Sequence, residues 1–157
     1  MTEPAGVSDA VGAADAVGAV NAVDAVDAFS VFARGCPSRE TLGHVTGRWG
    51  ALTLSALAED ALRFNELRRR VDGVSEKMLS QTLHALERDG LVLRDARPTN
   101  PPHVEYRLSP LGADTARRLL ALIELVEGRM PEVLAARERY DEARERETPG
   151  VRGAAAR

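Results

Sequence analysis

The sequence lacks several features on which whole classes of protein depend. It has one cysteine, which excludes an intramolecular disulfide framework and a cysteine-built metal site. It has no run of eighteen apolar residues, so no transmembrane helix is expected. Its N-terminus has neither the basic region nor the long leucine-rich core of a secretory signal. We therefore expect a cytoplasmic protein of one ordinary domain with tails, without a membrane partner.

Lysine is almost absent, and the net charge of −3 is low for a protein that binds nucleic acid. The charge is unevenly distributed, however. Residues 1–30 carry 5 acidic and no basic residues, residues 31–110 carry 12 basic against 10 acidic residues, and residues 111–157 carry 9 of each. A mildly basic middle therefore lies between an acidic leader and a balanced tail, and this distribution concerns partners rather than fold.

The composition divides the chain into three parts. Residues 1–30 are a low-complexity leader of Ala, Val, Gly and Asp, for which we favour a mobile segment over a helix that packs on a partner. Residues 31–127 have the composition of a folded domain. Residues 128–157 begin as a charged helical extension and end as a tail that we expect to be disordered.

The folded part predicts short helices and then a hairpin. Helices are expected over residues 37–45, 47–58 and 63–71, and Ser75 is a good N-cap for a further helix that stops at Gly90. The apolar residues of that helix predict its buried stripe, and they are Met78, Leu79, Leu83 and Leu86. Residues 91–93 and 104–108 predict two strands, joined by a proline-bearing loop.

A long helix is expected after Ser109-Pro110. Its apolar residues recur at steps of three and four as far as Leu134, and Pro131 should kink or restart the helix. A small domain would not cover such a stripe alone, so we expect a homodimer. The predicted interface consists of Leu119, Leu122, Ile123, Val126 and Met130.

The ordered string of motifs resembles the HxlR-type winged helix-turn-helix transcription regulators, which are relatives of the MarR group. The matching residues are Cys36-Pro37, Gly47–Trp49, Arg63–Arg69, Val74–Gln81, Leu83, Leu86-Glu87, Asp89–Val92, Pro101–Tyr106 and Ser109–Gly112. The resemblance covers about residues 36–127. It implies a mostly α fold with a small β-hairpin, a winged helix-turn-helix domain and a long C-terminal dimerisation helix. The family usually has arginine where this chain has Thr82, His84 and His103.

The helix after Ser75 is the candidate recognition helix, because a DNA major groove admits one α-helix. Its outward residues are short, polar and rich in donors: Ser75, Lys77, Ser80, Gln81 and His84. Gln81 can pair with adenine, and Lys77 can reach guanine or phosphate. Taken alone, the helix is better explained as an ordinary solvated amphipathic helix, and the helix before it and the wing after it reverse that preference.

Further basic residues are candidates for contacts with the DNA backbone, which supply affinity and register. Arg68, Arg69 and Arg70 follow one another and cannot all face one way. One or two of them can reach phosphates, and we expect the rest to be solvated or paired with Glu66. On the wing, the candidates are Arg94, Arg97 and His103.

Cys36 is a candidate redox sensor. It lies at the expected start of a helix beside Arg34 and Arg39, an arrangement that favours a reactive thiol. The resemblance implies that a cysteine at this place can respond to oxidants or electrophiles. With one cysteine, such a response needs an intersubunit disulfide or a thiol adduct. The alternative is a small buried residue, which a cysteine outside a disulfide usually is.

No motif supports catalysis, and no cofactor is expected. The three histidines are not at metal-ligand spacing, and no phosphate-binding loop or nucleotide fingerprint is present.

Our first interpretation is a sequence-specific regulator that binds double-stranded DNA, and the family resemblance alone favours a repressor over an activator. The alternatives are a winged-helix module that binds proteins, and a sensor with a small-molecule pocket between dimer helices, lined by Trp49 and Ile123.

Overall fold

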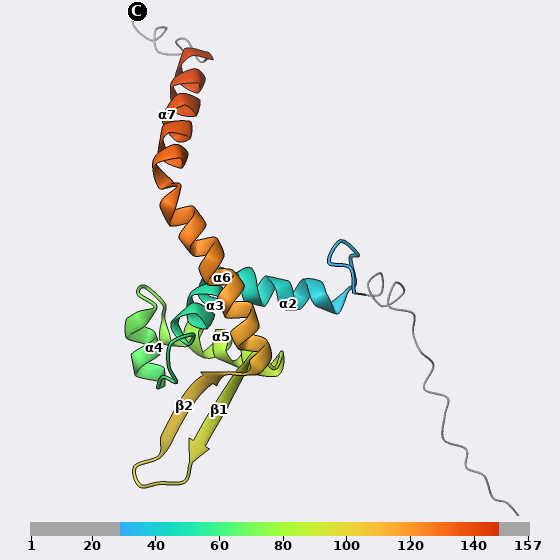
Figure 1. Cartoon of the computed structure of the whole chain (residues 1–157), viewed down its shortest axis with the longest axis vertical. Helices are drawn as coiled ribbons and strands as arrows, with labels where there is room; N and C mark the ends of the chain where they lie inside the picture. Colours follow the sequence, from blue (N-terminus) through green and yellow to red (C-terminus); the bar gives the residue numbers. More distant parts are fainter. Residues whose placement is uncertain (1–28, 148–157) are drawn as a thin grey trace, which may run out of the picture. The chain divides into compact units, whose positions relative to one another are not determined.

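The computed structural model describes residues 29–147. Within this part, residues 29–39 and residues 40–147 belong to two separate compact units. The described part is mostly helical with one antiparallel hairpin (Figure 1), which confirms the predicted fold class. Its elements are α2 (Pro37–Thr46), α3 (Arg48–Ala56), α4 (Phe64–Arg70), α5 (Glu76–Arg88), β1 (Val92–Arg97), β2 (His103–Leu108), α6 (Pro110–Gly128) and α7 (Met130–Glu147). The predicted leader lies outside the described residues except for Phe29 and Ser30.

Serine caps and glycine turns set the ends of the two principal helices, as the sequence predicts. The Ser75 hydroxyl accepts a hydrogen bond from the Met78 amide at 3.2 Å and so begins α5. After α5 the chain turns at Gly90, whose φ of +72° favours glycine. Ser109 caps α6 by accepting from the Gly112 amide at 3.0 Å, and its hydroxyl donates to the Gly90 carbonyl at 2.6 Å. One serine therefore joins the start of α6 to the end of α5.

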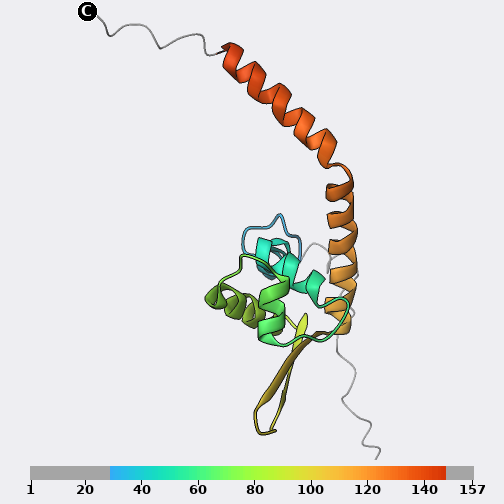
Figure 2. The ribbon, with the colours of Figure 1, turned by 90° about the vertical axis from the view of Figure 1, so that its left-hand side faces the viewer.

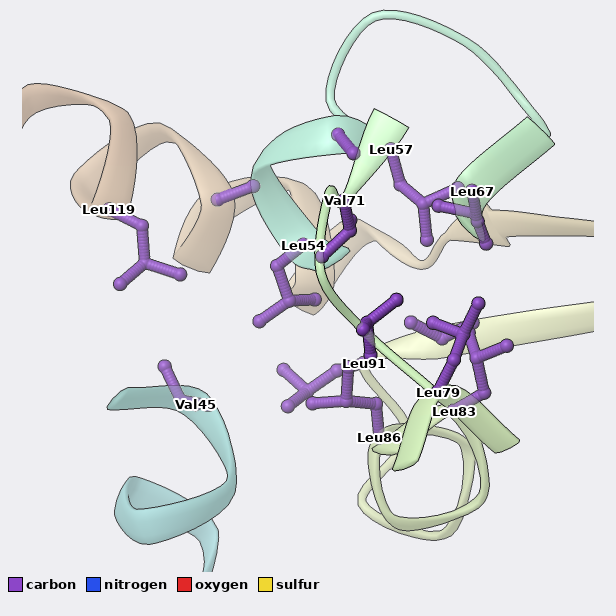
Figure 3. Close-up of a cluster of buried hydrophobic side chains, with 14 residues drawn as sticks. Val45, Leu54, Leu57, Leu67, Val71, Leu79, Leu83, Leu86, Leu91 and Leu119 are labelled. Carbon is purple, nitrogen blue, oxygen red and sulfur yellow. The ribbon is translucent and has the colours of Figure 1, made fainter. Parts of the chain in front are cut away.

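The hydrophobic core lies between α3, α4, α5 and α6 (Figure 3). Each helix contributes leucines that are almost completely shielded from solvent, and burying one such side chain contributes about 1.5–3 kcal/mol. Leu54, Leu67, Leu79 and Leu86 are 0% exposed. Gly112 brings α6 close to this core, since a Cβ there would lie 1.9 Å from the Leu91 carbonyl oxygen.

The prediction that Met78 belongs to the buried stripe of α5 is wrong. Its side chain is 39% exposed, whereas Leu79, Leu83 and Leu86 are buried. Successive residues of a helix are about 100° apart, so Met78 lies well to one side of Leu79. Spacing alone could not decide which of the two adjacent residues faces the core.

The hairpin is longer than predicted, and its connection is shorter. β1 pairs with β2 in antiparallel register from Val92 opposite Leu108 to Arg97 opposite His103. Arg94 and Arg97 therefore lie on a strand and not in a loop. The ladder continues past the apolar residues because polar side chains on an exposed strand can point into water. The main chain of Leu62 also bonds with that of Tyr106, at 3.0 and 2.9 Å, which ties the segment before α4 to the hairpin.

The predicted long helix is two helices, because the chain leaves helical geometry at Arg129 and restarts beside Pro131. This outcome confirms the predicted effect of Pro131. The first half of α6 packs on α3, and α7 has no buried residue and extends away from the helices of the core (Figures 1 and 2). Within the described residues, no helix is long and apolar enough to cross a membrane.

Candidate nucleic-acid interface

The recognition-helix candidate presents its predicted polar face to solvent. Helix α4 leads through a tight turn at Gly73 (φ +81°) into α5, whose opposite side is anchored in the core. All the predicted outward residues are exposed: Ser75, Lys77, Ser80, Gln81 and His84. The Ser75 hydroxyl accepts the hydrogen bond that caps the helix, and its O–H stays available as a donor. The exposure agrees with the predicted face, while contact with DNA stays a prediction.

Lys77 lies in the first turn of α5 and is exposed. No ion pair among residues 29–147 involves its ammonium group. The first two turns of α5 therefore carry one cation, Lys77, and several hydrogen-bonding side chains. No carboxylate among the described residues pairs with that cation. This combination suits the acceptors and phosphates of a DNA groove.

The three consecutive arginines of α4 separate as predicted, but their pairing differs from the prediction. Arg68 donates to Glu76 at 2.5 Å, and Arg70 donates to Glu59 at 3.2 Å. In the described part of the chain none of the three arginines pairs with Glu66, which we gave as the alternative to solvation, because that carboxylate accepts from the Arg63 amide at 2.7 Å and caps α4. The Arg68–Glu76 and Arg70–Glu59 pairs are solvent-exposed, and such pairs contribute at most about 1 kcal/mol.

Arg69 is exposed, and in the described part of the chain it forms no ion pair. Arg94 on β1 has the same properties. Arg97 lies 3.7 Å from Asp95, a loose exposed contact. These three arginines therefore remain accessible to an incoming phosphate.

His103 forms hydrogen bonds with two side chains of its own chain. An Nη2 N–H of Arg63 donates to its Nδ1 at 2.5 Å, and its Nε2 donates to Glu105 at 2.6 Å. The His103 hydrogen bond is the main reason that the pKa of Glu105 lies below its ordinary value, and the charges of Arg97 and Arg63 add to it. Both ring nitrogens are therefore engaged within the chain and join the wing to the start of α4, while contact of His103 with DNA stays a prediction.

A second polar link holds the C-terminal end of α5 and was not predicted. His44 Nδ1 lies 2.7 Å from the carboxylate of Asp89, the C-cap of α5, and both side chains are partly buried. Nearby, Arg88 donates to Glu40 at 3.3 Å. Residues more than forty positions apart meet here, so no local sequence pattern could have indicated the contact.

The predicted dimer face is only partly exposed. Leu119 belongs to the core of its own protomer, where it is 7% exposed, so it is not a surface residue. Leu122 and Val126 are 55% and 49% exposed, and Ile123 and Met130 are half-buried. Leu125, which the sequence reasoning missed, is the most exposed residue of this face at 59%.

A groove of about 490 Å³ continues this surface between α2 and α6. Its apolar lining includes Leu42, Leu111 and Leu122. Together with Leu125 and Val126, these residues form a surface that we call the α6 apolar face. Contiguous exposed apolar surface of this kind marks an interaction site.

Cys36 lies in the first unit, directly before α2. Its thiol is buried, and its sulfur lies 3.0 Å from the Ser38 hydroxyl. The same hydroxyl donates to the Phe29 carbonyl at 2.6 Å. The predicted position at a helix start is confirmed, and a sensing role stays a prediction.

Trp49 lines a groove between the α2–α3 corner and α5. Ile123 is not among the lining residues of that groove. Within the described residues, no group of histidine, cysteine and carboxylate side chains could hold a metal ion.

The helix, turn, helix and hairpin described above agree with a family of known proteins. Residues 44–133 match the family model of the HxlR-like helix-turn-helix. The chain belongs to the HxlR-like helix-turn-helix family. The match includes α3 to α6, both strands and the start of α7, so it covers the whole candidate interface.

Relatives of this HxlR-like chain support the assignment. It is 55% identical to the HTH-type transcriptional regulator YtfH of Escherichia coli (strain K12) over 109 residues, 69% of this chain and 86% of that protein. Its structure is similar to that of the transcriptional regulator YtfH from Salmonella typhimurium, with a TM-score of 0.66 and 53% identity over 69% of this chain and 97% of that chain. It is also similar to the redox regulator HypR in its oxidized form, with a TM-score of 0.55 and 33% identity over 59% of this chain and 96% of that chain. The HxlR-like chain is a transcriptional regulator of the helix-turn-helix type.

Proposed function

We propose that the chain is a homodimeric, sequence-specific DNA-binding regulator that inserts α5 into the major groove. The observation that carries this proposal is the exposed polar face of α5, with Lys77 in no ion pair among the described residues, on a helix anchored behind by buried leucines. A major groove about 12 Å wide accepts one α-helix, and its edges offer acceptors and donors to such a face.

Each exposed group has a chemical role in this proposal. Gln81 reads a base edge with its amide, and Lys77 contacts guanine or phosphate. The exposed guanidinium groups of Arg69, Arg94 and Arg97 contact the backbone from α4 and the wing, which fixes the register of the helix on the duplex. The Arg63–His103–Glu105 link holds the wing at a set angle to α4 while this contact forms.

The α6 apolar face is occupied by a second copy of the chain in this proposal. One winged domain contacts little DNA, and two copies read half-sites about one helical turn apart. The face holds five apolar residues, Leu42, Leu111, Leu122, Leu125 and Val126, that are exposed or line a groove. Burying them between copies removes apolar surface that one protomer leaves in water.

The test begins with selection of a duplex by the wild-type chain from a random-sequence library. Binding is then titrated for Lys77→Ala and Gln81→Ala, each of which should weaken specific binding by ~1–3 kcal/mol. Arg139→Ala, on the solvent-exposed helix α7, is the matched control and should bind normally. Wild-type affinity in both α5 variants would contradict the recognition-helix assignment.

A module that binds a protein through the same face is the competing interpretation. Salt dependence separates the two, because each phosphate contact releases counterions and makes log Kobs fall as log salt rises. A chain that selects no duplex, and whose binding to a protein partner changes little with salt, would favour the protein-binding module. Repression is the expected sign of regulation, and a reporter driven by a promoter that contains the selected site should be less active when the chain is present.

We also propose that Cys36 makes the regulator responsive to thiol oxidation. The similarity to the redox regulator HypR and the position of Cys36 before α2 support this role. Diamide would oxidise two Cys36 thiols, one from each copy, to an intersubunit disulfide, with both thiol hydrogens transferred to diamide. A dimer band on a non-reducing gel and altered duplex binding should appear in the wild type and be absent in Cys36→Ser. No adduct and unchanged binding in the wild type would leave Cys36 a structural residue.

A further inference from the structure

An open groove of about 260 Å³ lies beside the exposed face of α5. One wall comes from α5 itself, and the other comes from the corner between α2 and α3. The corner is built from glycines, since a Cβ at Gly50 would lie 1.8 Å from the His44 carbonyl oxygen and one at Gly47 would lie 2.9 Å from that of Gly43. The lining residues are Gly43, His44, Gly47, Arg48, Trp49, Gly50, Met78, Gln81, Thr82 and Ala85, and no carboxylate is among them.

Arg48 supplies the positive charge at this groove. Its side chain is exposed, and its guanidinium carbon lies 5.6 Å from the centre of the Trp49 ring. A guanidinium over an indole face is held by the cation–π interaction and keeps its N–H donors available. No ion pair among residues 29–147 involves Arg48, whereas Arg68, Arg70 and Arg88 each have a carboxylate partner. Among these residues, no carboxylate partner therefore competes with an external anion for Arg48.

The groove lies on the side of α5 next to its base-reading face. Its α5 residues are Met78, Gln81, Thr82 and Ala85, which form one side of a helix at steps of three and four. This side is turned by about a quarter of a helical turn from the predicted base-reading face, at about 100° per residue. Gln81 belongs to both sides, so the groove begins where the base-reading face ends.

We propose that Arg48 contacts a backbone phosphate of the duplex at the edge of the groove that receives α5, held in place by Trp49. A helix about 10–12 Å across fills the major groove, so its flanks face the sugar–phosphate backbones that bound the groove. An arginine beside such a flank meets a phosphate and can bind it with two N–H donors. This inference rests on the proposed function, because it needs α5 in the major groove. It adds a phosphate contact from the start of α3, outside α4, α5 and the wing.

The salt dependence of duplex binding tests the contact, because it counts neutralised phosphates. For Arg48→Ala, the slope of log Kobs against log salt should be shallower by about 0.9 per chain, for the selected duplex and for a scrambled duplex alike. Arg48→Lys keeps the charge and should keep the slope. Arg48→Gln keeps a long polar side chain without the charge and should lose the same slope as Arg48→Ala. Arg139→Ala removes one exposed arginine on α7 and should leave the slope unchanged.

The outcomes distinguish this inference from the proposed function. If the wild type selects no duplex, both fall. If the wild type selects a duplex and Arg48→Ala keeps the full slope, or Arg139→Ala loses as much, the Arg48 contact is wrong and the proposed function stands. A melting temperature equal to the wild type in Arg48→Gln shows that a lost slope is not unfolding.

The single tryptophan of the chain gives an independent readout, because Trp49 lies in the groove. Saturation with the selected duplex should change its emission in the wild type and change it less in Arg48→Ala. Unchanged emission in the saturated wild type would contradict a phosphate seated at Arg48.

Discussion

Helix α5 and the second half of α6 carry apolar residues at the same helical spacing and meet opposite surroundings. In α5, Leu79 and Leu86 are fully buried, at 0% exposure. In α6, Leu122 and Leu125 are more than half exposed. The periodicity alone would give both helices the same role. The difference shows that the chain completes its core with α5 and the start of α6, and leaves apolar residues of the second half of α6 exposed.

The comparison also separates two kinds of stability. Buried leucines of α5 stabilise the fold of each protomer, whatever the protein concentration. In the proposed dimer, leucines of the α6 apolar face stabilise only the assembled pair, and by mass action their contribution grows with concentration. Substitutions in the two helices should therefore differ in how their effects depend on concentration, as well as in size.

The largest expected effect is that of Leu86→Ala in the core. Truncating a buried leucine costs about 2–5 kcal/mol of unfolding free energy, and this loss should be the same in dilute and concentrated samples. Leu122→Ala is the matched change on α6 and should lower the unfolding free energy mainly at high concentration. Urea unfolding at two concentrations checks both, and an equal, concentration-independent loss in the two variants would remove the distinction between the helices.

A smaller effect is expected from Leu125→Glu on the α6 apolar face. A carboxylate buried between copies should weaken the dimer by about 2 kcal/mol or more, which is roughly 30-fold in Kd. The protomer should keep its far-UV circular dichroism, because Leu125 is 59% exposed. Sedimentation equilibrium measures the change, with Arg139→Ala as control. A monomeric wild type at micromolar concentration, or a variant that dimerises normally, would contradict the assigned face.

The smallest effect belongs to the polar link between the wing and α4, where His103 and Glu105 are partly buried. Since the His103 hydrogen bond lowers the pKa of Glu105 below 4.5, the link contributes stability above that pH and loses it as the pH falls through the lowered pKa. His103→Ala should move the pKa of Glu105 back up and flatten the acid-side loss of stability. An NMR titration of the Glu105 carboxyl carbon measures this shift, and an unmoved pKa would show that another group lowers it.

Much of the fold follows from local signals in the sequence. Ser75, Gly90 and Ser109 mark helix ends through their own hydrogen bonds or backbone angles, so each of these ends could be predicted from a few neighbouring residues. The restart of the helix at Pro131 is equally local. The outward polar face of α5 follows from a helical period of 3.6 residues once its start is known.

The features that the sequence did not predict depend on contacts between distant segments. The hydrogen bond between Arg63 and His103 joins residues forty positions apart. His44 and Asp89 meet over a similar separation. Leu119 has the spacing of an interface residue, but the packing of α6 on α3 places it in the core. Met78 has the spacing of a core residue, but the packing of α5 on its neighbours leaves it exposed. Arg48 belongs to the Gly47–Trp49 motif, but its position beside α5 depends on the corner between α2 and α3.

Methylation interference on the selected duplex tests most directly whether α5 enters the major groove. Methylation of guanine N7, which lies in that groove, should block binding of the wild-type chain at two clusters of bases about one helical turn apart. In Gln81→Ala, base preference should be lost within these clusters and nowhere else. Binding that tolerates N7 methylation throughout the selected duplex would contradict the placement of α5.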